Sequence, residues 1–509
     1  SVTSGGNIHV GVMTATSYSG DGSNLTGIAA TNFNTQTVTA NSAETIIDLA
    51  DGNCITMNQS ADTTVGFAST STAMDITLIR IKDSNSTART ITWPDSVKWN
   101  GGSAPTLISN SIAGDSQQFQ FLTRDGGLTW YAWEPYKKDV LTYSVFSWGN
   151  DENGSLGQNT PNTDQSSPMQ IGTNTTWLKA SADGLRNGAV KGDGTLWTWG
   201  NNQQGNLGQN NKTNYSSPRQ VGTDTNWANI KMDNIVLAVK TDGTLWAWGQ
   251  NENGEMGVNN RTQTSSPIQL PGTNWSSEYI FTGYGCAGAM KTDGTLWSWG
   301  YNNRGQLGQN QAGSGAPNSI SSPAQVPGTW SEASMAQWTT YGIKTDGTLW
   351  VWGSNGQGNL GQNNTTQRSS PTQIPGTTWT NIGLGGRIAR DCFVNKTDGT
   401  LWGWGENGNG SLAQNNKAPA VQYSSPVQIG GSSWNTSIRS SKGFTYGNLG
   451  GAIKTDGTLW MWGANNFGCL GQNISHPALE GRSSPIQLPG TNWTGISIGS
   501  DHVMAMKDE

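Results

Sequence analysis

The sequence is poor in charged residues and in histidine. Charged residues make up 12% of its 509 residues, and there are three histidines; an ordinary globular chain has about a quarter charged residues. The formal net charge is −6, and the longest run of adjacent basic residues is Lys137-Lys138. A basic patch that would hold nucleic-acid phosphates is therefore missing, and no nucleic-acid partner is expected.

Cysteines and long apolar runs are scarce as well. Cys54, Cys286, Cys392 and Cys469 lie far apart with no Cys-x-x-Cys pair, which argues against a disulfide framework and against a zinc site. No apolar stretch approaches the ~20 residues that cross a bilayer, so no membrane insertion is expected. No secretion signal opens the chain, but it starts with Ser1, which leaves open whether this is a true or a processed N-terminus.

Motifs of catalysis are also absent. His9, His476 and His502 show neither metal-ligand nor triad spacing, and no Gly-x-Ser-x-Gly elbow precedes a helical pattern. The glycine-rich loops contain no Gly-Lys-Ser/Thr sequence for phosphate binding. We therefore expect a protein that is not an enzyme and has neither cofactor nor metal. A hydrolase whose carboxylate pair is assembled from several loops is the remaining enzymatic alternative.

What the chain does have is a repeat. Leu-Trp-x-Trp-Gly recurs about every 50 residues, and a degenerate copy, Val145-Phe146-Ser147-Trp148-Gly149, precedes the others. Ser-Ser-Pro and a later single tryptophan recur with the same period, and periods of this size indicate propellers, solenoids or arrays. The second tryptophans of the seven copies are predicted to be structural: Trp148, Trp199, Trp248, Trp299, Trp352, Trp404 and Trp462.

Each repeat unit is predicted to hold four short strands. Its Asp-Gly pair tolerates the positive φ of a tight hairpin, so the repeated aspartates, such as Asp242, are interpreted as turn residues. Leu-Trp-x-Trp places apolar side chains on both faces of its strand, which must then be covered on both faces. A propeller blade between two neighbours provides that cover.

The two ends of the repeat region complement each other. The sequence ends with an Ala-x-Lys strand near His502 that no Leu-Trp-x-Trp-Gly strand follows. Residues 143–149 resemble such a Leu-Trp-x-Trp-Gly strand, and no Ala-x-Lys strand precedes them. The N-terminal strand is therefore predicted to complete the last blade. This closes a ring of seven blades over residues 143–509 and removes the exposed edge of an open array.

The repeat resembles that of the regulator-of-chromosome-condensation family. The resemblance rests on Lys-Thr-Asp-Gly-Thr-Leu-Trp-x-Trp-Gly, Asn-x-x-Gly-x-Leu-Gly-Gln-Asn and Ser-Ser-Pro-x-Gln, covers about 370 residues, and implies a seven-bladed β-propeller. A histidine frequent in the family is kept here only as His502, and other units have residues such as Gly285 or Arg390. Some family members exchange guanine nucleotides on a small GTPase, and similar propellers inhibit secreted enzymes; both are alternatives for this chain.

The N-terminal third of the chain reads as a separate all-β domain. Residues 75–81 and 118–122 alternate apolar and polar side chains, and Arg124-Asp125-Gly126-Gly127 predicts a hairpin to residues 128–133. We expect a small β-sandwich or jelly-roll-like domain over residues 34–136. A Gly/Ser/Thr-rich arm or connector over residues 1–33 precedes it, and a linker over residues 137–142 follows it.

Parts of this region resemble phage tail and fibre proteins, particularly those of phages that infect cyanobacteria. Residues 91–107 with the hairpin resemble a β-domain common in these proteins, and residues 14–27 resemble short segments along their fibres. The resemblance implies a virion structural protein, a tail fibre, spike or capsid decoration assembled in the host cytoplasm. Its N-terminal region would bind other virion proteins, and a homo-oligomer is compatible with this role. Trp93 and Trp99 are either core residues or a sugar-stacking platform.

Recognition is expected in the residues that do not repeat. Ring symmetry places the ten-residue loops after each Trp-Gly on one rim, where they would meet a host-surface glycan or protein. A second group of loops, whose residues depart from the repeat, precedes the Ala-x-Lys strands and lies on the same rim or on the opposite one. The alternative is that these residues differ only because the repeats have diverged, and that they bind no ligand. The candidate recognition residues are Tyr301, Arg304, Phe467, His476, Trp338, Arg387 and Arg390.

Overall fold

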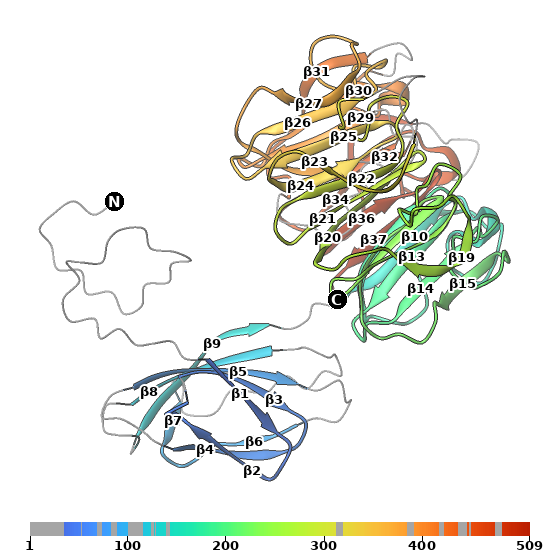
Figure 1. Cartoon of the computed structure of the whole chain (residues 1–509). Helices are drawn as coiled ribbons and strands as arrows, with labels where there is room; N and C mark the ends of the chain where they lie inside the picture. Colours follow the sequence, from blue (N-terminus) through green and yellow to red (C-terminus); the bar gives the residue numbers. More distant parts are fainter. Residues whose placement is uncertain are drawn as a thin grey trace, which may run out of the picture. The chain divides into compact units, whose positions relative to one another are not determined.

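The computed structural model shows an all-β protein in two compact units, residues Ser1–Asp139 and Val140–Glu509 (Figure 1). The all-β class and the propeller predicted from the sequence are confirmed. Each unit is described by itself. The residues that the structure describes are 35–51, 53–68, 74–82, 89–99, 116–123, 127, 129–138, 143–311, 319–383, 391–416, 422–435, 445–446, 449–473 and 481–508.

The first unit is built from two sheets around one core. The described strands form a larger sheet of order β1-β3-β5-β8-β9-β7 and a smaller one of order β2-β4-β6. Side chains from both sheets, such as Ile47, Ile55 and Phe121, share a single buried cluster. The strands are β1 (Thr35–Ala40), β2 (Glu44–Asp48), β3 (Cys54–Gln59), β4 (Thr63–Ala68), β5 (Met74–Lys82), β6 (Ile91–Thr92), β7 (Val97–Trp99), β8 (Ser116–Thr123) and β9 (Trp130–Lys138).

The first six strands wind in parallel, which differs from the antiparallel order of a jelly roll. Thr35 in β1 pairs with Cys54 in β3, which pairs with Thr77 in β5, and β2, β4 and β6 form the same parallel series in the other sheet. Each strand is followed by one in the opposite sheet, so neighbours within a sheet run in the same direction. Periodicity along a strand could not show this, because it reports which face is buried and not which strand lies alongside.

The end of the first unit agrees with the predicted hairpin. Strands β8 and β9 pair antiparallel, with Leu122 opposite Tyr131, while most of the connecting turn lies outside the described residues. Strand β9 runs to Lys138, two residues into the segment that the sequence assigned to the linker. Trp93 and Trp99 pack edge-on against each other and against Phe119, at 5.2 to 5.8 Å between ring centroids. They therefore lie where the core interpretation puts them.

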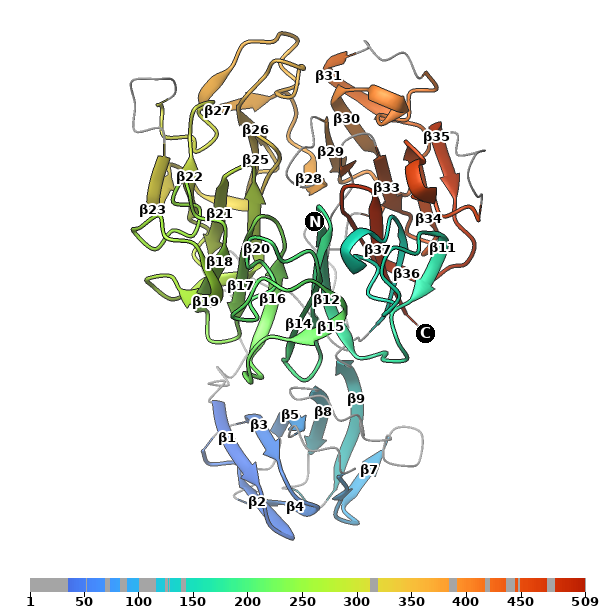
Figure 2. The same ribbon diagram turned by 90° about the vertical axis from the view of Figure 1, so that its right-hand side faces the viewer.

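In the described part of the second unit, seven four-stranded sheets are arranged in a ring (Figure 2). The first five of them along the chain are β12 (Trp177–Asp183) to β15 (Tyr215–Gln220), β16 (Trp227–Lys231) to β19 (Thr264–Gln269), β20 (Trp275–Gly283) to β23 (Ser319–Val326), β24 (Trp330–Met335) to β27 (Arg368–Ile374), and β28 (Trp379–Gly383) to β31 (Gln422–Ile429). The last two are β32 (Thr445–Tyr446) to β35 (Arg482–Gln487), and β10 (Ser144–Gly149) and β11 (Gln165–Gln170) with β36 (Trp493–Ile498) and β37 (His502–Lys507).

The remaining elements complete these sheets. The middle strands of the blades are β13 (Arg186–Lys191), β14 (Leu196–Gly200), β17 (Ile235–Lys240), β18 (Leu245–Gly249), β21 (Cys286–Lys291), β22 (Leu296–Tyr301), β25 (Thr339–Lys344), β26 (Leu349–Gly353), β29 (Asp391–Lys396), β30 (Leu401–Glu406), β33 (Leu449–Ile453) and β34 (Leu459–Gly463). Three short 3-10 helices lie in the described loops: η2 (Glu152–Gly154), η3 (Gly408–Gly410) and η4 (Asn466–Gly468).

Within a blade, the strand that begins at the single tryptophan lines the centre of the ring. In the second blade this is β16, which is followed outward by β17, β18 and the Ser-Ser-Pro strand β19. The Ala-x-Lys strand, β17, lies second from the centre. The reason is the hairpin order: β17 must pair with both β16 and β18, which leaves β16 at the edge.

The ring is closed by strands from both ends of the repeat region, as predicted. Strand β10 lies between β11 and β37, and Ser144 to Gly149 pair antiparallel with Lys507 to His502. The N-terminal segment therefore supplies two strands of this blade, where the sequence predicted one. Main-chain hydrogen bonds at the seam leave neither β10 nor β37 as a free edge.

The second tryptophans of the repeats join each blade to its neighbour. All seven are fully buried, and each indole N–H donates to a main-chain carbonyl in a loop of the adjacent blade. The Trp248 indole reaches the Asn206 carbonyl at 2.7 Å, and the Trp148 indole closes the ring on the Cys469 carbonyl, also at 2.7 Å. Each of these tryptophans thus contributes one large side chain and one hydrogen bond to the contact between two blades.

Candidate functional sites

The loops after each Trp-Gly are held by their second residue. The Asn202 side chain accepts a bond from the Leu207 N–H at 2.9 Å and donates to the Thr213 carbonyl at 3.0 Å. Asp151 replaces this asparagine in the first loop and accepts from the Leu156 N–H at 2.8 Å. These buried side chains fix the loop backbone, so the other loop residues are displayed on a rigid support.

The loops that precede the Ala-x-Lys strands lie on the same rim as these loops. The Ser354 N–H, directly after the Trp-Gly of β26, donates to the Trp338 carbonyl at 2.8 Å. The Tyr301 N–H bonds to the Gly285 carbonyl at 2.7 Å in the same way one blade earlier. For these loops, the two groups of candidate residues that the sequence kept apart therefore share one surface.

Four side chains gather on this rim, and we call them the rim cluster: Tyr284, Tyr301, Arg304 and Trp338. The Arg304 guanidinium lies 5.6 Å from the centre of the Trp338 ring, in cation–π range. Tyr284 packs edge-on against the same indole, with ring centroids 5.6 Å apart. Tyr284 is 37% exposed, Arg304 is exposed, and Trp338 and Tyr301 are half-buried.

The rim cluster crosses a blade boundary. Tyr284 follows β20, Tyr301 ends β22 and Arg304 follows it, whereas Trp338 lies between β24 and β25 of the next blade. The Asn303 side-chain amide also donates to the Tyr301 hydroxyl, which orients that ring. Two candidates named from the sequence, Arg304 and Trp338, are thus brought together by tertiary structure, and Tyr301 lies in the same loop as Arg304.

Tyr284 was missed by sequence reasoning. It is an aromatic residue at a position of the repeat where other units have residues such as Gly184 or Asp233. The signal that could have found it is the same one that selected Trp338: a large aromatic side chain where the repeat has a small or polar one.

The other candidates do not join the rim cluster. Phe467 lies in η4 of the blade that contains β34, is 41% exposed, and has a φ of 55°. Positive φ is unusual for a large side chain and strains the backbone. His476, Arg387 and Arg390 lie outside the described residues.

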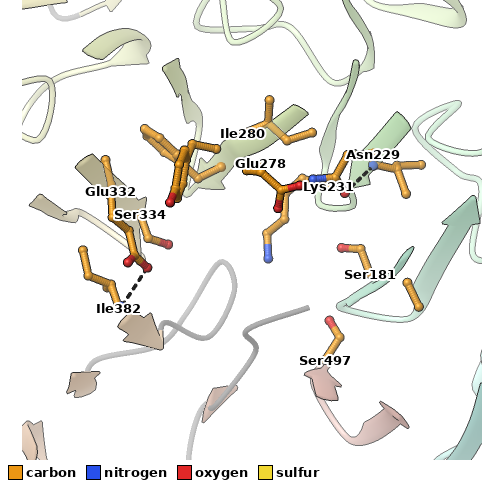
Figure 3. Close-up of a pocket in the computed structure, with 14 residues that line it drawn as sticks. Ser181, Asn229, Lys231, Glu278, Ile280, Glu332, Ser334, Ile382 and Ser497 are labelled. Carbon is orange, nitrogen blue, oxygen red and sulfur yellow. Dashed lines mark hydrogen bonds between the residues drawn. The ribbon is translucent and has the colours of Figure 1, made fainter. Parts of the chain in front are cut away.

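A second candidate site is a cavity of about 80 Å³ at the centre of the ring (Figure 3). Residues from the innermost strands β12, β16, β20, β24, β28 and β36 line it. The Lys231 side chain extends from β16 into the cavity, where it faces a lining that includes Ser181, Ser334 and Ser497. No pattern in the sequence points to this cavity, because the residue types that line it change from one repeat to the next.

Two of the carboxylates around this cavity are bonded to other groups of the protein. Glu278 forms an ion pair with Lys179, at 3.2 Å between Oε2 and Nζ. Glu332 Oε1 accepts a hydrogen bond from the Ile382 N–H at 2.8 Å. Lys231 is half-buried, and burial lowers the pKa of its amine, with a weaker opposite effect from nearby carboxylates.

The repeated aspartates serve the turns. Asp242 Oδ1 accepts from the Thr244 N–H at 2.9 Å and from its hydroxyl at 2.7 Å, and these bonds lower the pKa of the carboxyl. Among the described residues, no group of three or more His, Cys, Asp or Glu side chains is placed to hold a metal ion. No helix in the described ranges is long and apolar enough to span a membrane.

The comparisons with known proteins agree with this geometry. A family model described as the RCC1-like domain matches residues 144–505, well over half of the chain. The chain belongs to the RCC1-like domain family. Among curated relatives of this RCC1-like propeller, human E3 ubiquitin-protein ligase HERC2 is 25% identical over 220 residues, which are 41% of this chain. The Protein RCC2 homolog of Danio rerio is 29% identical over 136 residues, or 26% of this chain.

The match spans only part of these relatives, 4% of HERC2 and 25% of the RCC2 homolog. Solved structures cover the propeller more fully. Human WBSCR16 has a TM-score of 0.60 at 20% identity, over 72% of this chain and 99% of its own. Yeast RCC1 (Prp20), in a structure with Kap60 bound, has a TM-score of 0.59 at 16% identity, over 72% of this chain and 89% of its own. At these identities the similarity establishes the fold.

Proposed function

We propose that this RCC1-like propeller is a non-enzymatic scaffold that binds a protein partner, with the rim cluster as its anchor. The observation that carries the proposal is the convergence of Tyr284, Arg304 and Trp338 from three loops of two blades. Tyrosine, tryptophan and arginine are the residue types that dominate binding energy at protein interfaces. The rigid loop supports described above would keep this surface organised before a partner arrives.

Family membership suggests partners for this propeller. Yeast Prp20p has been crystallised in a study of its binding to Gsp1p and histones, and its complex with Kap60 is known. A partner of this kind, with nucleotide exchange on a small GTPase as the activity, is the alternative favoured by family membership. An enzyme-inhibitor role remains the other family-based alternative.

The virion role is the finer form of the proposal. It rests on the resemblance of residues 14–27 and 91–107 to phage fibre proteins. In this form, the N-terminal unit attaches to other virion proteins, and the propeller presents its rim to a host-surface protein or glycan. The two forms differ in the partner and agree on the surface that binds it.

The test uses the full chain and three immobilised probes: a panel of small GTPases, host envelope proteins and virion proteins. We expect the wild-type chain to bind one class and Trp338→Ala to weaken that binding at least tenfold, because a central anchor contributes about 2 kcal/mol or more. Ile268→Ala, which removes a side chain 42% exposed on the outer strand β19, is the matched control and should bind like the wild type.

Each outcome decides something. Nucleotide exchange above background would select the GTPase alternative over the virion role. Binding that survives Trp338→Ala, Arg304→Ala and Tyr284→Ala would show that the partner uses another surface, and would overturn the rim cluster as the anchor.

A further inference from the structure

The central cavity contains hydrogen-bond donors that the protein does not use. Among the described residues, neither the Lys231 amine nor the Ser334 hydroxyl has a hydrogen-bond or ion-pair partner. Ser181 Oγ accepts a bond from the Met232 N–H at 3.0 Å, which leaves its own hydrogen free to donate. All three residues line the cavity.

The acceptors around the cavity are better satisfied. Glu278 already has Lys179 as its ion-pair partner, and Glu332 holds the Ile382 N–H. Ser497 Oγ accepts a bond from the Ala182 N–H at 2.8 Å. The imbalance favours a ligand that accepts hydrogen bonds over one that donates them.

Lys231 is the group that such a ligand would stabilise most. The residue is half-buried among the innermost strands, and this burial disfavours the charged form of its amine. Asp183 and Asp233 act on it in the opposite direction and favour the charge. An ammonium that has lost part of its hydration is stabilised by an anion placed beside it in the cavity.

We propose that the central cavity is a binding site for a small oxyanion, a carboxylate or phosphate group, held by Lys231 with the Ser181 and Ser334 hydroxyls as further donors. The volume of about 80 Å³ admits a ligand of several heavy atoms. The site is separate from the rim cluster, because the two share no residue. Its failure would therefore leave the proposed protein-binding function untouched.

The direct test is competitive lysine acylation of the full chain, read by mass spectrometry at each lysine. Inorganic phosphate and sodium acetate are the two probes, and chloride holds the ionic strength constant. We expect a bound anion to slow the labelling of Lys231 at least tenfold while Lys212, an exposed loop lysine, is labelled at an unchanged rate. The probe that protects at the lower concentration identifies the oxyanion. Equal labelling of Lys231 with and without both anions would overturn the proposal.

A variant tests the same site by stability. Lys231→Met keeps most of the length of the side chain and removes the charge. The melting temperature of the wild type should rise with anion concentration, as for any ligand that binds only the folded state. Lys231→Met should lose this rise, and the surface control Lys212→Met should keep it. An equal rise in all three proteins would show a general salt effect and would contradict the site.

Discussion

At the scale of single residues, tryptophan has two roles that residue type alone does not separate. Trp248 is fully buried between blades and donates to the Asn206 carbonyl. Trp338 is half-buried on the rim and contacts Arg304 and Tyr284. A tryptophan that recurs in every repeat has the first role, and one that departs from the repeat has the second. The position of a tryptophan within the repeat therefore predicts its role.

Trp248→Ala should destabilise the propeller by ~3 to 5 kcal/mol, because it leaves a large cavity and an unbonded carbonyl between two blades. Thermal or denaturant unfolding of the purified chain measures this loss. Trp248→Phe, which keeps most of the ring and removes only the donor, should lose less. An unchanged melting temperature for Trp248→Ala would contradict the burial seen here.

At the scale of the element, the hairpin Lys-Thr-Asp-Gly-Thr-Leu-Trp is a small bonded network. The Trp246 indole donates to the Thr244 hydroxyl at 3.0 Å, which in turn donates to Asp242 at 2.7 Å. The Lys240 amine lies 4.3 Å from the centre of the Trp246 ring and bonds to Asp224 at 2.8 Å. The lysine, aspartate, threonine and first tryptophan of this repeat unit therefore each have a structural contact within the blade.

Thr244→Val tests this network. Valine has nearly the same shape but no hydroxyl, so the Trp246 indole and Asp242 each lose a partner, and we expect a loss of about 1 kcal/mol in the free energy of unfolding. Thr241→Val, at an exposed position of the same turn, should change stability by less than half as much. If the two variants melt alike, the indole–hydroxyl–carboxylate chain does not stabilise the hairpin.

At the scale of the whole propeller, stability depends on one seam where the two ends of the repeat region meet. His502 begins β37 at this seam, is fully buried, and its Nε2 lies 2.8 Å from Asn187 Oδ1 in the neighbouring blade. Burial lowers the pKa of His502 from 6.5 to about 4. Burial thus favours the neutral form of the histidine at this seam.

The pH dependence follows from that pKa. Above pH 6.5 the histidine is neutral in both states and costs nothing; between pH 6.5 and about 4 only the unfolded chain takes up the proton. Stability should therefore fall by up to about 3 kcal/mol across this window and level off below it. Burial raises the pKa of the Asp501 carboxyl. Asp501 therefore changes the stability in the opposite direction as the pH falls, and it does so equally in the wild type and in the His502→Gln variant.

The comparison with His502→Gln isolates the effect, because glutamine cannot titrate and Asp501 is unchanged. Melting temperatures measured from pH 7 to pH 4 should fall less steeply in the variant than in the wild type. Parallel curves would mean that His502 does not control the acid stability of the seam.

The sequence by itself determined the propeller. A long period, turn residues at fixed positions and apolar side chains on both faces of Leu-Trp-x-Trp require stacked blades, and complementary half-units at 143–149 and 502–507 require closure. These are local rules repeated seven times, so each copy strengthens the same prediction. Alternation also predicted the strands of the first unit, though not their parallel order.

Tertiary structure alone decided where the candidate sites lie. Trp338 and Arg304 are 34 positions apart in the sequence, and only the packing of adjacent blades puts the guanidinium over the indole. Lys231 looks like any other strand lysine until six innermost strands enclose it. Periodicity describes what neighbouring blades share, whereas both sites are made of residues in which the blades differ, and their meeting depends on the closed ring.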